Sequence, residues 1–244
     1  AISVGTRPDC LNDDAIAFMQ SLQDFGDVWV ELGVQTSCDE TLRRIHRGHS
    51  WACSRDAIQR LHQAGLHVAV HVMVGLPGET QTDNMATMAA LAVLPIDGIK
   101  FHNVHVIKNT ELASWYEKEP FPVLSEYDYA EILMELLRRT PAHWPIMRLN
   151  TDTPPDELIA PLWHMKKGSF IDYVTAQMIY RDWYQGERLP GSTEMATPAD
   201  PFDDKTTDDG SLTLWNSEYK EHYHTAAGAW NEAQHKFLHP SGIA

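Results

Sequence analysis

The sequence predicts an α/β fold in which short parallel strands alternate with amphipathic helices. Five apolar runs recur through the first 150 residues, with helical patterns between them. This order is typical of a parallel sheet with helices on the outside. The runs are nearly all apolar rather than alternating, which predicts strands buried on both faces. The 244 residues, 43% of them hydrophobic, suffice for one large domain or one and a half ordinary ones.

Residue patterns place each element in turn. Strands are expected at Ile2–Thr6, Val28–Gln35, His67–Leu76, Gly98–Val106 and Ile146–Asn150. Helices are expected from Asn12 or Asp13 to Phe25, over Asp39–Arg47, from Ser54 to a stop at Gly65, over Thr82–Leu94 and from Ser125 to Arg139. The helix starts are assigned from side chains that accept hydrogen bonds from the first turn, and the stop from the tolerance of glycine for left-handed backbone.

The character of the chain changes after residue 150. A helical, aromatic pattern continues to residue 186, and residues 187–209 are rich in Pro, Gly and Asp, which predicts an acidic linker. Residues 210–244 contain a candidate strand, Leu212–Trp215, but are too few to bury a core of their own. They either pack back on the first domain or begin a second, incomplete one.

Composition excludes several classes of protein. The net charge of −15 disfavours indiscriminate binding to nucleic acid or anionic lipid. No long apolar run predicts a membrane span, and no signal peptide is visible. Cys10, Cys38 and Cys53 are too few and too scattered for a disulfide scaffold, so a reducing cytoplasm is the simplest setting. No pair has CxxC spacing, so we expect no metal or cluster bound by this chain.

The most informative stretch is His71–Thr80, where an apolar run ends in a Gly-Leu-Pro-Gly turn. Glycine lets a ligand approach the backbone closely, and N–H groups at a helix start can hold a polar cofactor. Many α/β proteins have such a turn, so a function can be inferred only from the turn together with the ends of the other strands. Polar residues also end the other strands, at Thr6-Arg7, Gln35-Thr36 and Lys100–His102. In a parallel barrel that end is where sites are built.

Together these segments resemble the radical SAM superfamily, most closely its YhcC-like/MnmL-like branch. The resemblance is carried by Ser3–Leu11, Trp29–Thr36, Glu40–His49, His71–Thr80, Asp97–His105 and Thr153–Trp163, and it covers residues 1–186. It implies a partial TIM-type (βα) barrel lacking its first strands over residues 1–150, with a helical C-terminal extension over residues 151–186. The acidic linker and the incomplete second domain would follow.

The resemblance also implies S-adenosylmethionine (SAM) lying across the strand ends. Gln35 would face the ribose, and Arg47, twelve residues later, would bind the SAM carboxylate. The turn containing Gly75, Pro77 and Gly78 would line the adenine. The other residues expected around this cavity are Thr6, Arg7, Thr36, His71, Lys100 and His102, the last two near adenine or substrate. The resemblance assigns no side chain of this chain as catalytic.

In this family, cysteine thiolates hold a reduced [4Fe–4S] iron–sulfur cluster, and electron transfer from the cluster starts the reaction. The three cysteines that would hold it belong upstream of this chain, so we expect an internal fragment, inactive alone, of an enzyme that generates a deoxyadenosyl radical. An electron donor such as flavodoxin or ferredoxin would serve the parent enzyme. The oligomeric state is left open.

A second resemblance lies in the tail. Asp209–Phe237 resembles the opening of a MnmC-like tRNA methyltransferase domain. The combination implies tRNA wobble-uridine side-chain modification coupled to SAM-dependent methylation. Two alternatives stay open: a radical SAM enzyme with a non-tRNA substrate, and a non-catalytic SAM-binding or scaffold module. An upstream cysteine motif would separate the enzymes from the module, and wobble nucleosides would separate the two enzymes.

Several residues have plainer interpretations. His102 and His105 suggest a metal pair, but this spacing on a strand puts the side chains on opposite faces. Trp163, Trp183 and Tyr184 are expected in the core rather than as stacking platforms for bases. Arg43 and Arg44 are expected on a solvated helix face.

Overall fold

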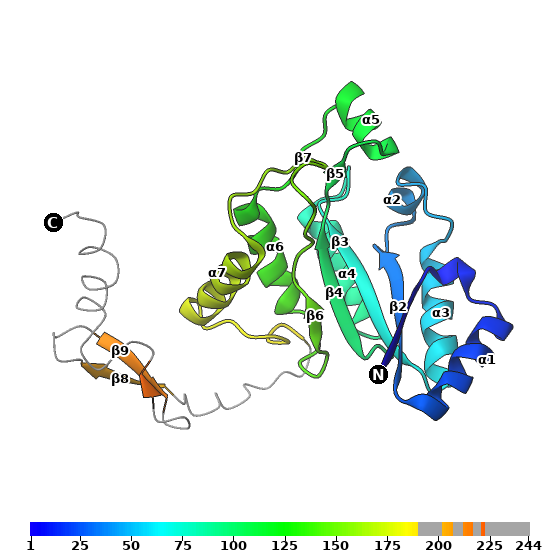
Figure 1. Cartoon of the computed structure of the whole chain (residues 1–244), viewed down its shortest axis with the longest axis horizontal. Helices are drawn as coiled ribbons and strands as arrows, with labels where there is room; N and C mark the ends of the chain where they lie inside the picture. Colours follow the sequence, from blue (N-terminus) through cyan, green and yellow to red (C-terminus); the bar gives the residue numbers. More distant parts are fainter. Residues whose placement is uncertain (190–201, 207–211, 217–220, 223–244) are drawn as a thin grey trace. The chain divides into compact units, whose positions relative to one another are not determined.

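The computed structural model describes residues 1–189 and three further strands, at Phe202–Thr206, Leu212–Asn216 and Glu221–His222. The chain divides into two compact units, Ala1–Gly191 and Ser192–Ala244. The first unit carries the sheet and helices that position the candidate site (Figure 1).

The first unit is built on a parallel sheet of five strands in the order β1-β2-β3-β4-β6. The strands are β1 (Ile2–Thr6), β2 (Val28–Gln35), β3 (His67–Val74), β4 (Gly98–Asn103) and β6 (Ile146–Arg148). The predicted α/β class with a parallel sheet is confirmed, and closure into a barrel stays a prediction. The last three strands end earlier than predicted. In β3 the reason is Gly75, whose φ of +89° turns the chain out of the sheet.

Helices follow the strands as the sequence predicts. They are α1 (Asp13–Ser21), α2 (Asp39–Arg44), α3 (Trp51–Gln63), α4 (Gln81–Leu91) and α6 (Glu126–Leu137), with short 3-10 turns at Pro8–Cys10 and Leu22–Phe25. The predicted start of α3 is wrong. Ser50 caps it, because its hydroxyl accepts a hydrogen bond from the N–H of Cys53 at 3.3 Å. Ser54 lies buried inside the first turn.

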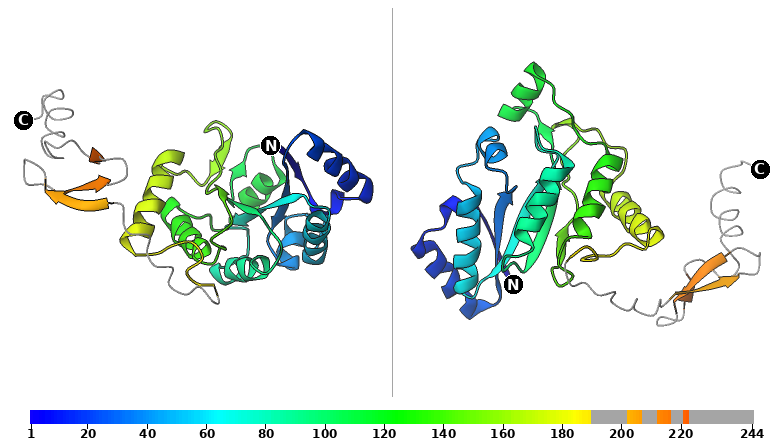
Figure 2. Two further views of the ribbon diagram at one scale, coloured as in Figure 1. Left: turned by 90° about the horizontal axis from the view of Figure 1, so that it is seen from below. Right: turned by 180° about the vertical axis from the view of Figure 1, so that it is seen from behind.

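The two faces of the sheet differ, contrary to the expectation that both are buried. On β2 the side chains of Val28, Val30, Leu32 and Val34 are buried, while the residues between them are only partly buried. The valines of β3 repeat the pattern, and these side chains join residues from α1, α3, α4, α6 and α7 in one core. The helices therefore cover one face (Figure 2). The other face, called here the open face, carries Ser3, Glu31, His71, Lys100 and His102.

Beyond the carboxyl edge of the sheet the chain forms a smaller layer. β5 (Val106–Ile107) pairs antiparallel with β7 (Leu158–Ala160), and α5 (Glu111–Lys118) packs on β5 through Ala113. The sequence did not predict α5. Helix α7 (Lys167–Tyr180) realises the helical pattern expected after residue 150. Trp163 and Trp183 pack against the main core, as expected. Tyr184 is 37% exposed, so its predicted place in the core is wrong.

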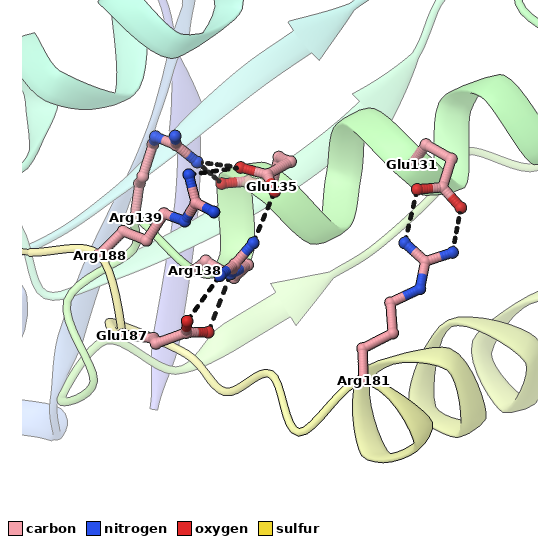
Figure 3. Close-up of polar contacts among 7 residues, drawn as sticks. All are labelled: Glu131, Glu135, Arg138, Arg139, Arg181, Glu187 and Arg188. Atoms are coloured by element: carbon pink, nitrogen blue, oxygen red, sulfur yellow. Dashed lines mark hydrogen bonds and ion pairs between the residues drawn. The ribbon is translucent and has the colours of Figure 1, made fainter. Parts of the chain in front are cut away.

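An ion-pair network fastens the segment after α7 to α6 (Figure 3). The Arg138 guanidinium donates to both carboxylate oxygens of Glu187, at 2.8 and 2.6 Å, and also to Glu135. The same guanidinium lies 3.9 Å from the ring centroid of Trp183. Its side chain is only 5% exposed, so this contact is screened little by solvent.

In the second unit, β8 (Phe202–Thr206), β9 (Leu212–Asn216) and β10 (Glu221–His222) form an antiparallel sheet in the order β10-β9-β8. The strand predicted at Leu212–Trp215 is present. β8 falls inside the range 187–209 predicted as a linker, because its backbone pairs with β9 from Phe202 to Thr206. Most of Asp209–Phe237 lies outside the described residues. No helix among the residues described is long and apolar enough to cross a membrane.

Candidate functional site

A cavity of about 500 Å³ opens at the carboxyl edge of the sheet. Parallel strands bring the residues that follow them to one edge, and ligand sites of α/β proteins form there. The lining residues come from the end of β2, the segment after α2, the turn after β3, and α5: Gln35, Arg44, Ile45, His46, Arg47, Met73, Leu76, Pro77, Val104, Glu111, Leu112 and Trp115. Three predicted site residues, Gln35, Arg47 and Pro77, therefore share this cavity.

Gln35 and Arg47 converge over the backbone of Gly33. Arg47 donates from Nη2 to the carbonyl of Gly33 at 2.8 Å. A Cβ added to Gly33 would meet both Arg47 Nη2 and Gln35 Nε2 at 2.9 Å, so a larger residue there would displace these two side-chain ends. Gln35 itself takes a φ of +69°, and the register of β2 against β3 shifts just before it. Backbone strain of this kind persists where the surroundings impose it, often at ligand sites.

Arg47 is built to meet an anion. Its Nε is buried without a hydrogen-bond partner among the described residues. Burial, and after it the charge of Arg7, lowers the pKa of the Arg47 guanidinium, although arginine stays protonated. A half-buried guanidinium with an unused donor favours a carboxylate as the missing partner.

The Gly75–Gly78 turn forms the next wall. Gly75 and Gly78 both have positive φ, +89° and +84°. The carbonyl of Pro77 accepts a hydrogen bond from Arg44 Nη1 at 3.1 Å, and a Cβ on Gly78 would lie 1.6 Å from that atom. Arg44 is exposed, as the sequence predicts, with 36% of its side chain accessible, and its guanidinium also packs over the turn. Pro77 lines the cavity, whereas the two glycines shape the turn behind it.

Helix α5 supplies a wall that sequence reasoning missed. Leu112 and Trp115 line the cavity, and Glu111 lies 3.2 Å from His46 Nδ1 on the opposite side. Thr110 caps the helix by accepting from the N–H of Ala113 at 3.1 Å. The sequence signal was present in this capping threonine, but nothing in the sequence places the helix over the strand ends.

A second polar group lies on the open face of the sheet. Glu31 accepts hydrogen bonds from Ser3 Oγ and Lys100 Nζ, both at 2.5 Å, and His71 Nε2 lies 2.9 Å from the same carboxylate. Burial alone would raise the pKa of Glu31, but the hydrogen bonds from Lys100, Ser3 and His71 lower it to about 2. Glu31, which the sequence did not single out, is thus a fixed anion that holds two predicted site residues.

His102 lies beside this group. Its ring centroid is 4.9 Å from that of His71, and its Nδ1 lies 2.9 Å from the Thr151 hydroxyl. Burial, then the charges of His71 and Arg148, lowers the pKa of His102 to about 3. Its Nε2 is buried without a partner among the described residues. His102 is therefore a neutral imidazole with one ring nitrogen unused.

The remaining three predicted site residues, Thr6, Arg7 and Thr36, also lie away from the cavity lining. Thr36 is buried, and its hydroxyl donates to Glu79 at 2.6 Å and lies 3.2 Å from that of Thr87. Arg7 pairs with Asp9 at 2.7 Å on an exposed surface, and the Thr6 hydroxyl reaches only the carbonyl of Arg7. Thr36 therefore ties the end of β2 to α4 rather than lining the cavity.

The cavity suits SAM, whereas the described residues do not suit an iron–sulfur cluster. The converging donors of Gln35 and Arg47 match a ligand with hydroxyl and carboxylate groups. No group of three or more His, Cys, Asp or Glu side chains in the described parts of the chain is arranged to hold a metal ion. Cys10, Cys38 and Cys53 are all free thiols.

Comparison with known families matches nearly the whole first unit. Residues 1–91 match the radical SAM superfamily, and residues 96–180 match the Radical SAM C-terminal domain. The uncharacterized protein YtqA of Bacillus subtilis is 34% identical over 186 residues, 76% of this chain and 58% of that protein. Protein YhcC of Escherichia coli K12 is 38% identical over 163 residues, 66% of this chain and 53% of that protein. The chain thus spans little more than half the length of these relatives.

More distant relatives include the tRNA uridine(34) acetyltransferase of Dehalococcoides mccartyi, 28% identical over 63% of this chain and 33% of that protein. Among solved structures, Elp3 of Methanocaldococcus infernus superposes with a TM-score of 0.67 over 91% of this chain and 55% of that one, at 21% identity. This likeness shows the fold alone. The two family matches show that the chain carries a radical SAM domain and a Radical SAM C-terminal domain.

Proposed function

We propose that the cavity at the strand ends binds SAM and that the parent protein modifies the side chain of the wobble uridine of tRNA. The observation that carries the SAM assignment is the convergence of Gln35 and Arg47 over Gly33. The tRNA assignment is supported by relatives named tRNA uridine(34) acetyltransferase, which share 28–29% identity with this chain.

Each wall of the cavity has a distinct role in this proposal. Arg47 holds the SAM carboxylate through its unused Nε–H, and Gln35 donates its amide to the ribose hydroxyls. Leu76 and Pro77 pack on the adenine, and Trp115 of α5 excludes water from the far side. SAM, when bound, supplies the deoxyadenosyl group that takes a hydrogen atom from substrate in this family.

The open face of the sheet is the substrate side of the proposed site. Lys100 and the unused Nε2 of His102 offer a cation and a neutral nitrogen side by side. A wobble-uridine side chain that ends in a carboxylate would pair with Lys100, whose charge Glu31 already orients. Coupling to methylation rests on the resemblance of Asp209–Phe237 to a MnmC-like domain.

Binding of SAM to the chain tests the first part of the proposal by calorimetry. Arg47→Lys keeps the charge but removes the planar fork, and SAM affinity should fall by about tenfold. Arg43→Lys is the matched control, because Arg43 is exposed on the preceding helix, away from the cavity lining. Equal affinities for the wild type and Arg47→Lys would remove the SAM site from this cavity.

Deletion of the gene, followed by mass spectrometry of tRNA nucleosides, tests the second part. We expect a modified wobble uridine to be lost or replaced by a precursor. Unchanged wobble nucleosides in a strain whose protein still binds SAM would favour a radical SAM enzyme with another substrate. Restoration of the nucleosides by Arg47→Lys as fully as by wild type would favour a scaffold without catalysis.

A further inference from the structure

A second cavity, of about 210 Å³, lies beside the loop that follows β6. We call it the loop pocket. Its walls come from three segments: the loop itself, the end of β7, and the start of α7. They include Asn150, Thr153, Pro161, Trp163, Lys166 and Lys167. None of these residues lines the first cavity.

One end of the loop pocket is cationic. Lys166 and Lys167 stand at the start of α7, a helix of 14 residues. No side chain caps this helix, so its first N–H groups are available to an anion. An ideal Cβ on Gly168 would have no atom within 4 Å, so the first turn is open. Although the chain has a net charge of −15, this end of the loop pocket is locally positive and attracts a phosphate.

The other end of the loop pocket holds an unsatisfied amide. Asn150 is only 3% exposed, and its Oδ1 is buried without a hydrogen-bond partner among the described residues. Such an atom costs free energy unless a ligand or water donates to it. This observation is independent of the helix start, and it calls for a ligand that carries an N–H or O–H group.

Flat rings and small apolar groups form the wall between the two ends. Trp163 is held in place, because its Nε1 donates to the Leu124 carbonyl at 3.0 Å and its ring stacks on Phe170. His105 is fixed by the Thr153 hydroxyl at 2.7 Å and meets Trp163 edge-on. Pro161 completes a rigid wall suited to the face of a planar ring.

We propose that the loop pocket binds a pyrimidine nucleotide of the RNA substrate, with uracil as the base. The uracil N3–H would donate to Asn150 Oδ1, and the 5′-phosphate would lie between Lys166, Lys167 and the start of α7. The small volume favours a one-ring base, since pockets for larger ligands usually exceed about 300 Å³. This inference rests on the proposed tRNA function and names the subsite that holds the nucleotide.

The loop pocket adjoins the part of the open face that carries His102. Thr151, next to Asn150, lies 2.9 Å from His102 Nδ1, and its backbone N–H donates to Asn103 at 2.8 Å. The loop that carries Asn150 therefore also carries the partner of His102. A nucleotide held by Asn150 would have its neighbouring substituents directed along the same loop toward His102 and Lys100.

Binding of uridine 5′-monophosphate to the full chain, followed by calorimetry and by NMR of the ligand, tests the proposal. We expect saturable binding that weakens by about tenfold in Lys167→Glu, because a charge-assisted contact is replaced by repulsion. Asn150→Leu, which removes the acceptor oxygen but keeps the size of the side chain, should weaken uridine 5′-monophosphate without changing the affinity for inorganic phosphate. Lys118→Glu, at the exposed end of α5, is the control and should change neither.

Thermal unfolding of each variant identifies any that fails to fold, and Lys166→Gln then replaces it. Inorganic phosphate that competes as well as uridine 5′-monophosphate, or an affinity unchanged in both Lys167→Glu and Asn150→Leu, would overturn the proposal. Altered wobble nucleosides in the deletion strain without binding at the loop pocket would reject the subsite alone. Binding without altered nucleosides would reject the tRNA function alone.

Discussion

The ammonium of Lys100 on β4 lies 2.5 Å from Glu31 Oε2 on β2, across the intervening strand β3. Both side chains are mostly buried, at 13% and 14% exposure. His71 on β3 stands between them at 2.9 Å from the same oxygen. Three neighbouring strands are thus joined on the open face by one carboxylate.

Replacing Lys100 with Met should lower the free energy of unfolding by about 1–3 kcal/mol, because a mostly buried carboxylate then loses its charged partner. The double variant Glu31→Gln/Lys100→Met should recover part of that loss, since no unpaired charge remains. Urea unfolding of the two variants and the wild type measures both effects. A double variant less stable than Lys100→Met would contradict the ion-pair explanation.

The stability of the protein should fall as the pH drops from about 6.5 to about 3. The folded protein keeps His102 neutral to about pH 3, whereas the unfolded chain protonates it near 6.5. The unfolded state therefore binds more protons in this window, so acid favours unfolding. Burial also lowers the pKa of His71, despite the nearby Glu31, and adds to the same slope.

Denaturant unfolding at several pH values measures this slope, and His102→Asn should make it shallower. Glu31, with its pKa near 2 against an ordinary 4.5, contributes a further loss only below about pH 4.5. A wild-type stability that is flat between pH 7 and pH 5 would contradict the burial of a neutral His102.

Gly78→Ala should destabilise the protein by about 1–3 kcal/mol, because alanine is strained at a φ of +84°. The added methyl group would also displace the Arg44 guanidinium from Pro77. Gly168→Ala is the matched control, since nothing surrounds that position and its φ is ordinary. Thermal unfolding compares the two, and equal melting temperatures would argue against strain in the turn.

Arg138→Met should lower the free energy of unfolding by about 3 kcal/mol, because Glu187 and Glu135 lose a shared, nearly buried cation. Arg181→Gln breaks a more exposed pair with Glu131 and should cost under about 1 kcal/mol. Hydrogen exchange should also speed up at the backbone N–H of Arg188, which donates to the Arg138 carbonyl. Protection unchanged there would show that the network does not hold this segment.

Local sequence predicted the strands well, because runs of valine and isoleucine between polar turns are typical of strands and of few other elements. It was a poorer guide at α3, where Ser50 and Ser54 offer the same hydroxyl four residues apart. Only the burial of Ser54 in the core distinguishes them. Inside the range predicted as a linker, β8 forms for a similar reason, since an acidic stretch becomes a strand when its backbone pairs with a partner such as β9.

The sequence predicted those site residues whose place follows directly from the end of a strand. Gln35 and Pro77 follow strands directly, so parallel topology alone brings them to one edge. Glu31 was missed, since its importance comes from Lys100, 69 residues away, and from His71. Trp115 was missed because its helix follows an irregular connection whose path depends on the pairing of β5 with β7.

The difference between the two faces of the sheet has a consequence for how such a protein can change. The face under the helices carries the valines of β2 and β3, and almost all the apolar burial of the sheet is there. The open face carries polar side chains whose replacement removes little of that burial. Residues on the open face can therefore be exchanged with little loss of apolar burial. That face can diverge between related proteins while the core under the helices is kept.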